Sequence, residues 1–249
     1  MYCRNDRNNN PTSTNHKLRN LKTFFNYLQS IDLYTDKSNP SKVMKYLIED
    51  IQIDVFSEKQ IKQMLNHFIR QKQKDKTFWA YRDYTVIYTL IGTGCRLGEL
   101  CNLRWKDIDI INYSITVVGK KRKQRSIPMT DKLKKEFAEY KVFCEQYFSN
   151  KELTYVFVDR DNKQLTPNSL KCVFKRLKEQ MQFKDVRLSA HTFRHYFCCQ
   201  MIKSGCDVLT LKNILGHESL TMVNRYYGLF GSALRSLNDK HNPLNNLDI

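Results

Sequence analysis

The chain has 249 residues, of which 41% are hydrophobic. It is therefore long and apolar enough for one large core or two modest ones, and it contains no apolar run of membrane-spanning length and no signal peptide. Its formal net charge of +17 predicts strong, salt-sensitive association with a polyanion, and eight cysteines without CxxC spacing favour reduced, mostly buried thiols in a cytosolic protein over a disulfide framework or a zinc site.

The N-terminal part of the chain predicts a short helical region behind a disordered lead. Residues 1–14 are polar and rich in asparagine, a composition typical of disorder. Residues 15–29 carry apolar side chains at helical spacing, and a second, short helical stretch is expected over 40–47. With a linker over 51–55, the whole of 15–55 is interpreted as one partial helical region.

A second domain is expected over residues 56–228. Ser57 is a predicted helix N-cap, and Gln60 three residues later completes a capping box. An amphipathic helix beginning near Phe78 is expected to end at Gly92.

In the rest of this domain, the spacing of apolar residues is typical of strands in some segments and of helices in others. Strand-like patterns fill residues 105–129 and 155–158, and helices are expected over 131–148, over 168–181 and from an N-cap at Asp207 to a stop at Gly216. The predicted fold class is therefore mainly α with a small antiparallel β-sheet (α+β). Residues 229–249 predict a short tail helix.

Three short motifs supply residue types that suit a phosphodiester. Arg96 follows two closely spaced glycines, and His191 and Arg194 lie three residues apart, on one face of a helix. His217 precedes Tyr226 by a fixed offset. A guanidinium matches two phosphate oxygens with a planar fork, so the two arginines could clamp one phosphate.

The other residues fit proton transfer and nucleophilic attack. A tyrosine, with an ordinary pKa of about 10, needs a neighbouring base or cations to act as a nucleophile, and His191 and His217 are the candidates. Lys120 could give a proton to the leaving 5′-oxygen. His195 is expected to be a hydrogen-bonded core residue that orients its neighbours. Tyr227, about 100° around a helix from Tyr226, is expected to pack.

These motifs, in this order, resemble the tyrosine recombinases of the phage integrase family from about residue 56 to about residue 227. Arg96 in Thr-Gly-x-Arg-x-x-Glu-Leu resembles the first catalytic arginine, and Lys120 after Gly119 resembles the lysine of the family's β-hairpin. The remaining matches are the His-x-x-Arg pair His191 and Arg194, the histidine position at His217 and the nucleophile at Tyr226.

The resemblance implies a 3′-phosphotyrosyl intermediate and a released 5′-hydroxyl, with no cofactor, ATP or metal. It also implies that 15–55 is a shortened core-binding region, and that the chain forms a homotetramer on two DNA duplexes. The tail 229–249 would then dock on the next protomer, although a helix packed within its own chain is an equal alternative. We also expect accessory DNA-bending or directionality proteins as partners and no membrane partner. The expected location is cytoplasmic and nucleoid-associated.

A basic run at the predicted hairpin tip is the candidate DNA contact. It comprises Lys121, Arg122, Lys123 and Arg125, beside Lys120. Phosphate contacts by such a run would give affinity for double-stranded DNA without sequence information. Lys121 and Lys123 lie in the same turn as Lys120, whose place after the glycine selects it as the acid.

Several functions remain open from the sequence. The first is a site-specific recombinase, an integrase or transposase of a mobile element or phage. Alternatives are a recombinase that resolves chromosome or plasmid dimers, a truncated DNA-binding protein of the same fold without recombination activity, and an enzyme that relaxes supercoils by the same chemistry.

Overall fold

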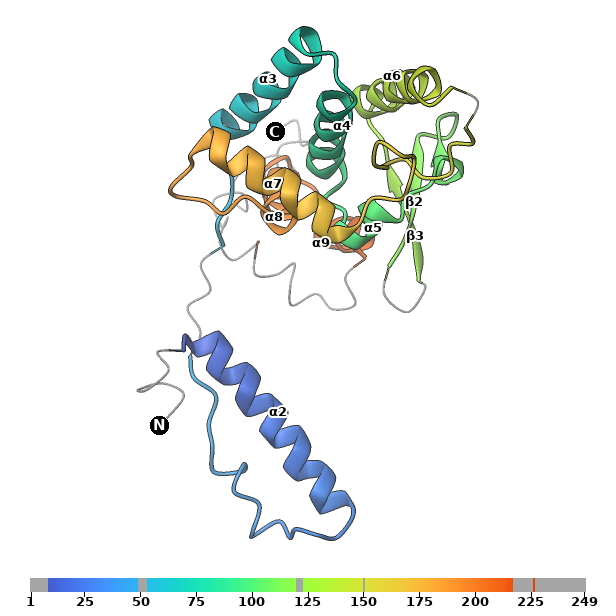
Figure 1. Ribbon diagram of the computed structural model, residues 1–249. Coiled ribbons are helices and arrows are strands. Elements are labelled where there is room, and N and C mark those ends of the chain that lie inside the picture. The colour runs from blue at the N-terminus through green and yellow to red at the C-terminus, as the bar shows by residue number, and fades with distance from the viewer. Residues whose placement is uncertain (1–8, 49–52, 120–122, 150, 217–225, 227–249) are drawn as a thin grey trace, which may run out of the picture. The chain divides into compact units, whose positions relative to one another are not determined.

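The computed structural model describes residues 9–48, 53–119, 123–149, 151–216 and 226. The chain divides into two compact units, Met1–Ile53 and Asp54–Ile249, which are described separately (Figure 1). The boundary lies two residues before the expected one. The predicted tail helix over 229–249 lies outside the described residues.

The first unit contains helix α2, Pro11–Ser30. It begins four residues before our expectation, because Asn10 caps it by accepting from the Ser13 amide (2.8 Å) and proline occupies its first position. The short helix predicted over 40–47 is wrong: these residues form turns and extended chain. The Asn15 side chain donates to the Leu47 carbonyl (2.9 Å) and accepts from its amide (2.8 Å), which fixes an extended backbone there.

The second unit is built around helix α4, Phe78–Thr93, which packs against α3, α6 and α8. Figure 1 shows α4 between α3 and α6. The helices are α3 Glu58–Lys74, α5 Leu97–Cys101, α6 Asp131–Tyr147, α7 Pro167–Met181, α8 Ala190–Lys203 and α9 Val208–Leu215, with a 3₁₀ turn at Trp105–Asp107.

Burial of α4 requires its polar side chains to be satisfied. Thr85, Thr89 and Thr93 each donate their hydroxyl to the carbonyl four residues earlier, at 2.9, 2.7 and 2.6 Å. These bonds allow three buried threonines on one face of the helix without an unpaired hydroxyl. The helix can therefore sit in the core beside apolar residues such as Ile87 and Leu90.

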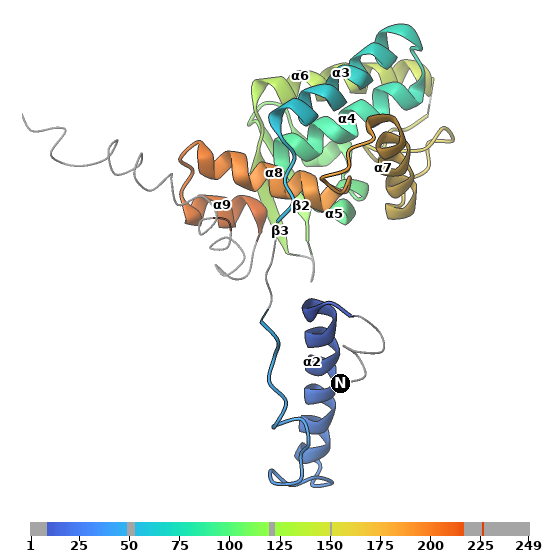
Figure 2. The same ribbon diagram turned by 90° about the vertical axis from the view of Figure 1, so that its left-hand side faces the viewer.

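A three-stranded antiparallel sheet has the order β1 (Ile108–Asp109), β2 (Ser114–Val118), β3 (Gln124–Pro128). Alternate residues of β2 are buried, as period-two patterning requires. β2 lies against α5 and β3 against α9 (Figure 2). The sheet therefore touches both short helices that border the candidate site.

The strand predicted over 155–158 is wrong. Tyr155 and Val158 form only isolated bridges, with Arg104 and Gln164. Residues 156–158 are a buried apolar connection whose backbone is satisfied by neighbouring loops, as in the bond from the Val156 amide to the Leu103 carbonyl (2.9 Å). Burial of a short apolar run does not by itself distinguish a strand from such a connection.

Most other elements agree with their predictions. The Ser57–Gln60 capping box is present, and α9 begins after its N-cap Asp207 and ends at Gly216. α4 runs one residue beyond Gly92 because Gly94, with φ 57°, terminates it in the left-handed conformation. The fold class, mainly α with a small antiparallel sheet, is confirmed. None of the described helices is long and apolar enough to cross a membrane.

Candidate active site

Arg96 is presented by a tight turn between two helices. Gly94 ends α4, and Arg96 is the N-cap of α5. A Cβ atom at Gly94 would lie 2.6 Å from Cδ1 of Phe197, so glycine is required both for the positive φ and for close packing on α8. The side chain of Arg96 is 41% exposed.

Glu99 holds Arg96 from two directions. Its Oε2 accepts from the Arg96 amide (2.7 Å) and its Oε1 from Arg96 Nη1 (2.9 Å). The Glu99 side chain is only 3% exposed. Burial alone would raise its pKa, but hydrogen bonds from Arg125 and Arg96 lower it to about 2. Sequence reasoning assigned Glu99 no role, although its position three residues after an N-cap is the spacing of a capping box.

Arg194 is buried at the meeting point of two helix ends. Its Nη1 donates to the Gly94 carbonyl (2.7 Å) and its Nη2 to the Leu215 carbonyl (2.8 Å). Burial and the neighbouring Arg96 lower its pKa to about 10, so it remains charged at neutral pH. Arg96 Nη2 reaches the next carbonyl of the α9 end, that of Gly216 (3.4 Å).

Tyr226 is buried against α8. Its exposed fraction is 2%, and its hydroxyl is hydrogen-bonded to Nδ1 of His195. Burial, with Cys198 alongside, raises the pKa of Tyr226 above its ordinary value. We predicted His191 and His217 as the bases that assist Tyr226, whereas in the structure its hydroxyl is hydrogen-bonded to His195.

The two histidines of α8 differ in exposure. His191 is exposed in the first turn, and its ring lies 4.5 Å from that of His195 in an edge-to-face arrangement. Desolvation, Arg194 and Arg96 lower the pKa of His191. Burial lowers the pKa of His195 to about 4, with His191 and Arg194 adding to the shift, so His195 is neutral at pH 7.

The predicted DNA-binding run is only partly described. Lys123 is exposed. Arg125, predicted as a DNA contact, has a side chain that is 12% exposed, and its guanidinium binds Glu99 and the Ile214 carbonyl. The other predicted residues of the hairpin tip and the C-terminal segment, Lys120, Lys121, Arg122, His217 and Tyr227, lie outside the described residues.

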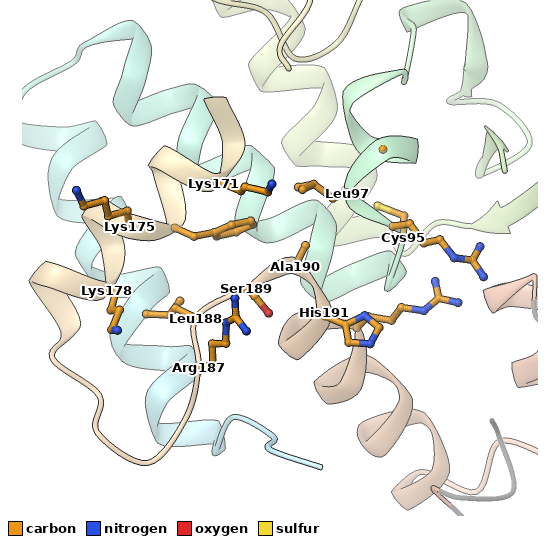
Figure 3. Close-up of a pocket in the computed structure, with 14 residues that line it drawn as sticks. Cys95, Leu97, Lys171, Lys175, Lys178, Arg187, Leu188, Ser189, Ala190 and His191 are labelled. Atoms are coloured by element: carbon orange, nitrogen blue, oxygen red, sulfur yellow. The ribbon is translucent and has the colours of Figure 1, made fainter. Parts of the chain in front are cut away.

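Arg96, His191 and Arg194 share one open cavity of about 710 Å³. Its far wall carries basic residues from α7 and the segment before α8, namely Lys171, Lys175, Lys178 and Arg187 (Figure 3). The three lysines follow i, i+4, i+7 spacing, so they occupy one face of α7. Sequence reasoning missed them, although this spacing was available as a signal.

Most of the described cysteines are buried, as the sequence predicted. The five buried ones are Cys95, Cys101, Cys144, Cys198 and Cys199. Within the described parts of the chain, no group of three or more His, Cys, Asp or Glu side chains is arranged to hold a metal ion.

Comparison with known proteins identifies the family. The model of the phage integrase family matches residues 54–231, more than two thirds of the chain. The chain belongs to the phage integrase family. This membership confirms the resemblance drawn from the motifs, and with it the predicted enzyme class of tyrosine recombinase.

Relatives include the tyrosine recombinase XerC of Chlorobaculum parvum, 28% identical over 96% of this chain and 75% of the relative. The tyrosine recombinase XerA of Pyrococcus furiosus is also 28% identical, over 94% of this chain and 76% of the XerA chain.

Solved structures show the same fold. The Tn1549 transposon integrase in complex with transposon right-end DNA has a TM-score of 0.75 at 23% identity, covering 95% of this chain and 81% of the other. XerA recombinase has a TM-score of 0.62 at 22% identity, covering 91% and 84%.

Proposed function

We propose that this phage integrase family member is a site-specific DNA recombinase that cuts and rejoins DNA through Tyr226. The observation that carries the proposal is the convergence of Arg96 and Arg194 on one open cavity, with a basic wall opposite. Two fixed guanidinium groups in a concave, positively charged site suit a phosphodiester whose charge increases during attack. Tyr226 belongs to the same compact unit.

In the proposed reaction, the Tyr226 oxygen attacks the scissile phosphorus and the bond to the 5′-oxygen breaks. The phenolic proton passes to a histidine, for which His191 and His217 are the candidates, and Lys120 gives a proton to the departing 5′-oxygen. Arg96 and Arg194 neutralise the non-bridging oxygens. The phosphotyrosyl ester retains the energy of the broken bond, so attack by a 5′-hydroxyl rejoins the strand without an energy source.

In the structure Tyr226 is buried and stands apart from the lining of the open cavity. Tyr226 is 2% exposed, its hydroxyl is bonded to His195, and it does not line the open cavity, so we propose that it moves before it attacks a phosphate bound there. Because His195 is neutral at pH 7, this contact holds without an ion pair that would have to be broken. The same burial favours the alternative function, a protein that binds DNA without cleaving it.

We propose that double-stranded DNA lies across the basic wall of the cavity as well as the hairpin tip. Lys171, Lys175 and Lys178 are exposed on one face of α7, and Arg187 lies beside them. Each phosphate that these side chains neutralise contributes roughly 0.9 to the dependence of log affinity on log salt. Lys123 and the other cations of the hairpin tip would add further phosphate contacts.

The biological role belongs to the same proposal. We favour integration or transposition of a mobile element or phage, with resolution of chromosome or plasmid dimers as the second role. A transposon integrase is among the proteins similar to this chain, which supports the first role. We also propose a homotetramer on two duplexes, with residues 15–55 as part of a core-binding region and 229–249 either exchanged between protomers or packed within its own chain.

A covalent-complex assay tests the function. The protein is incubated with a nicked suicide duplex carrying the sequence that flanks its own gene, and SDS-resistant adducts are counted. We expect an adduct with the unaltered protein and with Tyr147→Phe, whose tyrosine is 48% exposed at the end of α6, and none with Tyr226→Phe. Binding without an adduct by the unaltered protein would favour the DNA-binding alternative. An adduct that persists in Tyr226→Phe would move the nucleophile to Tyr227.

The proton donor has a separate test. Lys120→Ala should slow cleavage of the normal substrate but not of one with a better leaving group at the 5′-bridging position, because that group needs no proton. A variant that stays slow on both substrates would exclude Lys120 as the acid.

A further inference from the structure

Arg125 has the contacts of a structural cation rather than of a DNA-binding one. Its Nη1 and Nη2 donate to the two carboxylate oxygens of Glu99 at 2.6 and 2.9 Å, and its Nε donates to the Ile214 carbonyl at 2.8 Å. Its side chain is 12% exposed. Three of its five N–H directions are therefore committed within the protein.

The carboxylate that Arg125 binds is the one that holds Arg96. Glu99 accepts four hydrogen bonds, two from Arg125 and two from Arg96. With 3% of its side chain exposed, it could not stay ionised in one fixed orientation without such partners. Arg125 binds both oxygens of the carboxylate in bidentate geometry, which fixes the orientation of the carboxylate. The lone pairs that Arg96 binds are therefore held in one position.

The third bond of Arg125 links this pair to the C-terminal end of α9. The last carbonyls of that helix, from Ile214, Leu215 and Gly216, accept in turn from Arg125, Arg194 and Arg96. A helix C-terminus carries unpaired carbonyls and partial negative charge, so three cations are stabilised there.

Close packing supports the same arrangement. A Cβ atom at Gly216, where φ is 61°, would lie 2.7 Å from Cδ of Arg125. The glycine that ends α9 therefore also makes room for the aliphatic part of this side chain.

We propose that Arg125 is a positioning residue, which orients Arg96 through Glu99 and aligns both with the end of α9 beside Arg194. This positioning role takes the place of the DNA contact that the sequence predicted for Arg125. The inference deepens the proposed function and rests on it for its kinetic consequence, because Arg96 is the group that would hold the phosphate.

Lysine is the informative substitution. Arg125→Lys keeps the positive charge, so a contact based on charge alone would survive. An ammonium cannot bind both oxygens of Glu99 in a planar fork and also reach the Ile214 carbonyl. Arg160→Lys, at an exposed turn of the same unit, is the matched control.

The kinetic test uses single-turnover cleavage of the suicide duplex at saturating DNA. A displacement of about 1 Å in a catalytic group costs on the order of 100-fold in rate. We expect Arg125→Lys to lower the cleavage rate by about that factor, with an unchanged dissociation constant and salt slope, and Arg160→Lys to match the unaltered protein. Loss of affinity in Arg125→Lys or Arg125→Gln, with the rate restored by more DNA, would return Arg125 to the role of a DNA contact.

A second readout needs no activity. In protein labelled with ¹⁵N and ¹³C at arginine, restricted rotation of a guanidinium separates the signals of its two Nη atoms, and Arg96→Lys assigns the signals of Arg96. We expect separate signals in the unaltered protein and their collapse in Arg125→Lys. Equal restriction of Arg96 in both proteins would overturn the positioning role. Collapse in a protein whose unaltered form makes no Tyr226-dependent adduct would refute the proposed function alone.

Discussion

Glu99→Gln perturbs the group on which the candidate site is organised. The substitution keeps the size of the side chain but removes its charge and one acceptor oxygen. Arg96 and Arg125 then face an amide in place of a carboxylate that accepts four bonds. We therefore expect a loss of stability with a defined dependence on pH.

The magnitude follows from the pKa of Glu99, which is about 2 in the folded protein against an ordinary value of 4.5. A shift of about 2.5 units corresponds to about 3 kcal/mol of folding free energy. Because the folded pKa is lowered, this contribution is fully present above about pH 4.5 and is lost as the pH falls towards about 2. By about pH 3.5 about 1.4 kcal/mol of it should be gone.

Urea denaturation followed by tryptophan fluorescence measures this contribution. Both tryptophans, Trp79 and Trp105, lie in the second compact unit, so their signal reports the unit that contains Glu99. The quantity of interest is the difference in unfolding free energy between the unaltered protein and Glu99→Gln. Other carboxyl groups titrate in both proteins and cancel in that difference.

We expect the difference to be about 3 kcal/mol near pH 7 and to narrow by about 1.4 kcal/mol near pH 3.5. A difference that stays constant over this range would mean that Glu99 has an ordinary pKa in the folded protein. The reasoning about its four hydrogen bonds would then be refuted, together with the role of Arg125 that depends on them.

Three further predictions test other parts of the structure. Gly94→Ala should lower the free energy of unfolding by about 2–5 kcal/mol, because alanine is strained in the left-handed conformation and its Cβ would clash with Phe197. Gly98→Ala, whose new Cβ would have no atom within 4 Å, should be neutral or stabilising by up to about 1 kcal/mol in the same urea assay. Equal effects of the two substitutions would contradict the packing argument. In DNA-free protein, tetranitromethane should nitrate Tyr27 and Tyr147, which are 60% and 48% exposed, but not the buried Tyr226. Peptide mass spectrometry measures the nitration of each tyrosine. Nitration of Tyr226 as fast as that of Tyr27 and Tyr147 would show that Tyr226 is not buried in solution. Lys175→Gln should reduce the salt slope of DNA binding by roughly 0.9, measured by fluorescence anisotropy, and an unchanged slope would remove α7 from the DNA-binding surface.

The sequence by itself determined the features that depend on neighbours a few residues away. The capping box of Ser57 and Gln60 and the stop of α9 at Gly216 form within single turns of chain. The motif residues Arg96, His191 and Arg194 were likewise found by their spacing, and the structure brings those three to one cavity.

The tertiary structure decided the contacts between distant segments. The sequence placed Arg125 in a basic run as a candidate DNA contact, and its partners Glu99 and Ile214 lie 26 and 89 residues away. The partner of Tyr226 is His195, 31 residues earlier, rather than either predicted histidine. The lysines of α7 join the site of Arg96 only because the helices pack as they do. Local hydrogen bonds are fixed by the spacing of residues along the chain. Long-range ion pairs and burial depend on which surfaces of the helices and strands pack together, and a single sequence does not show which residues those contacts join.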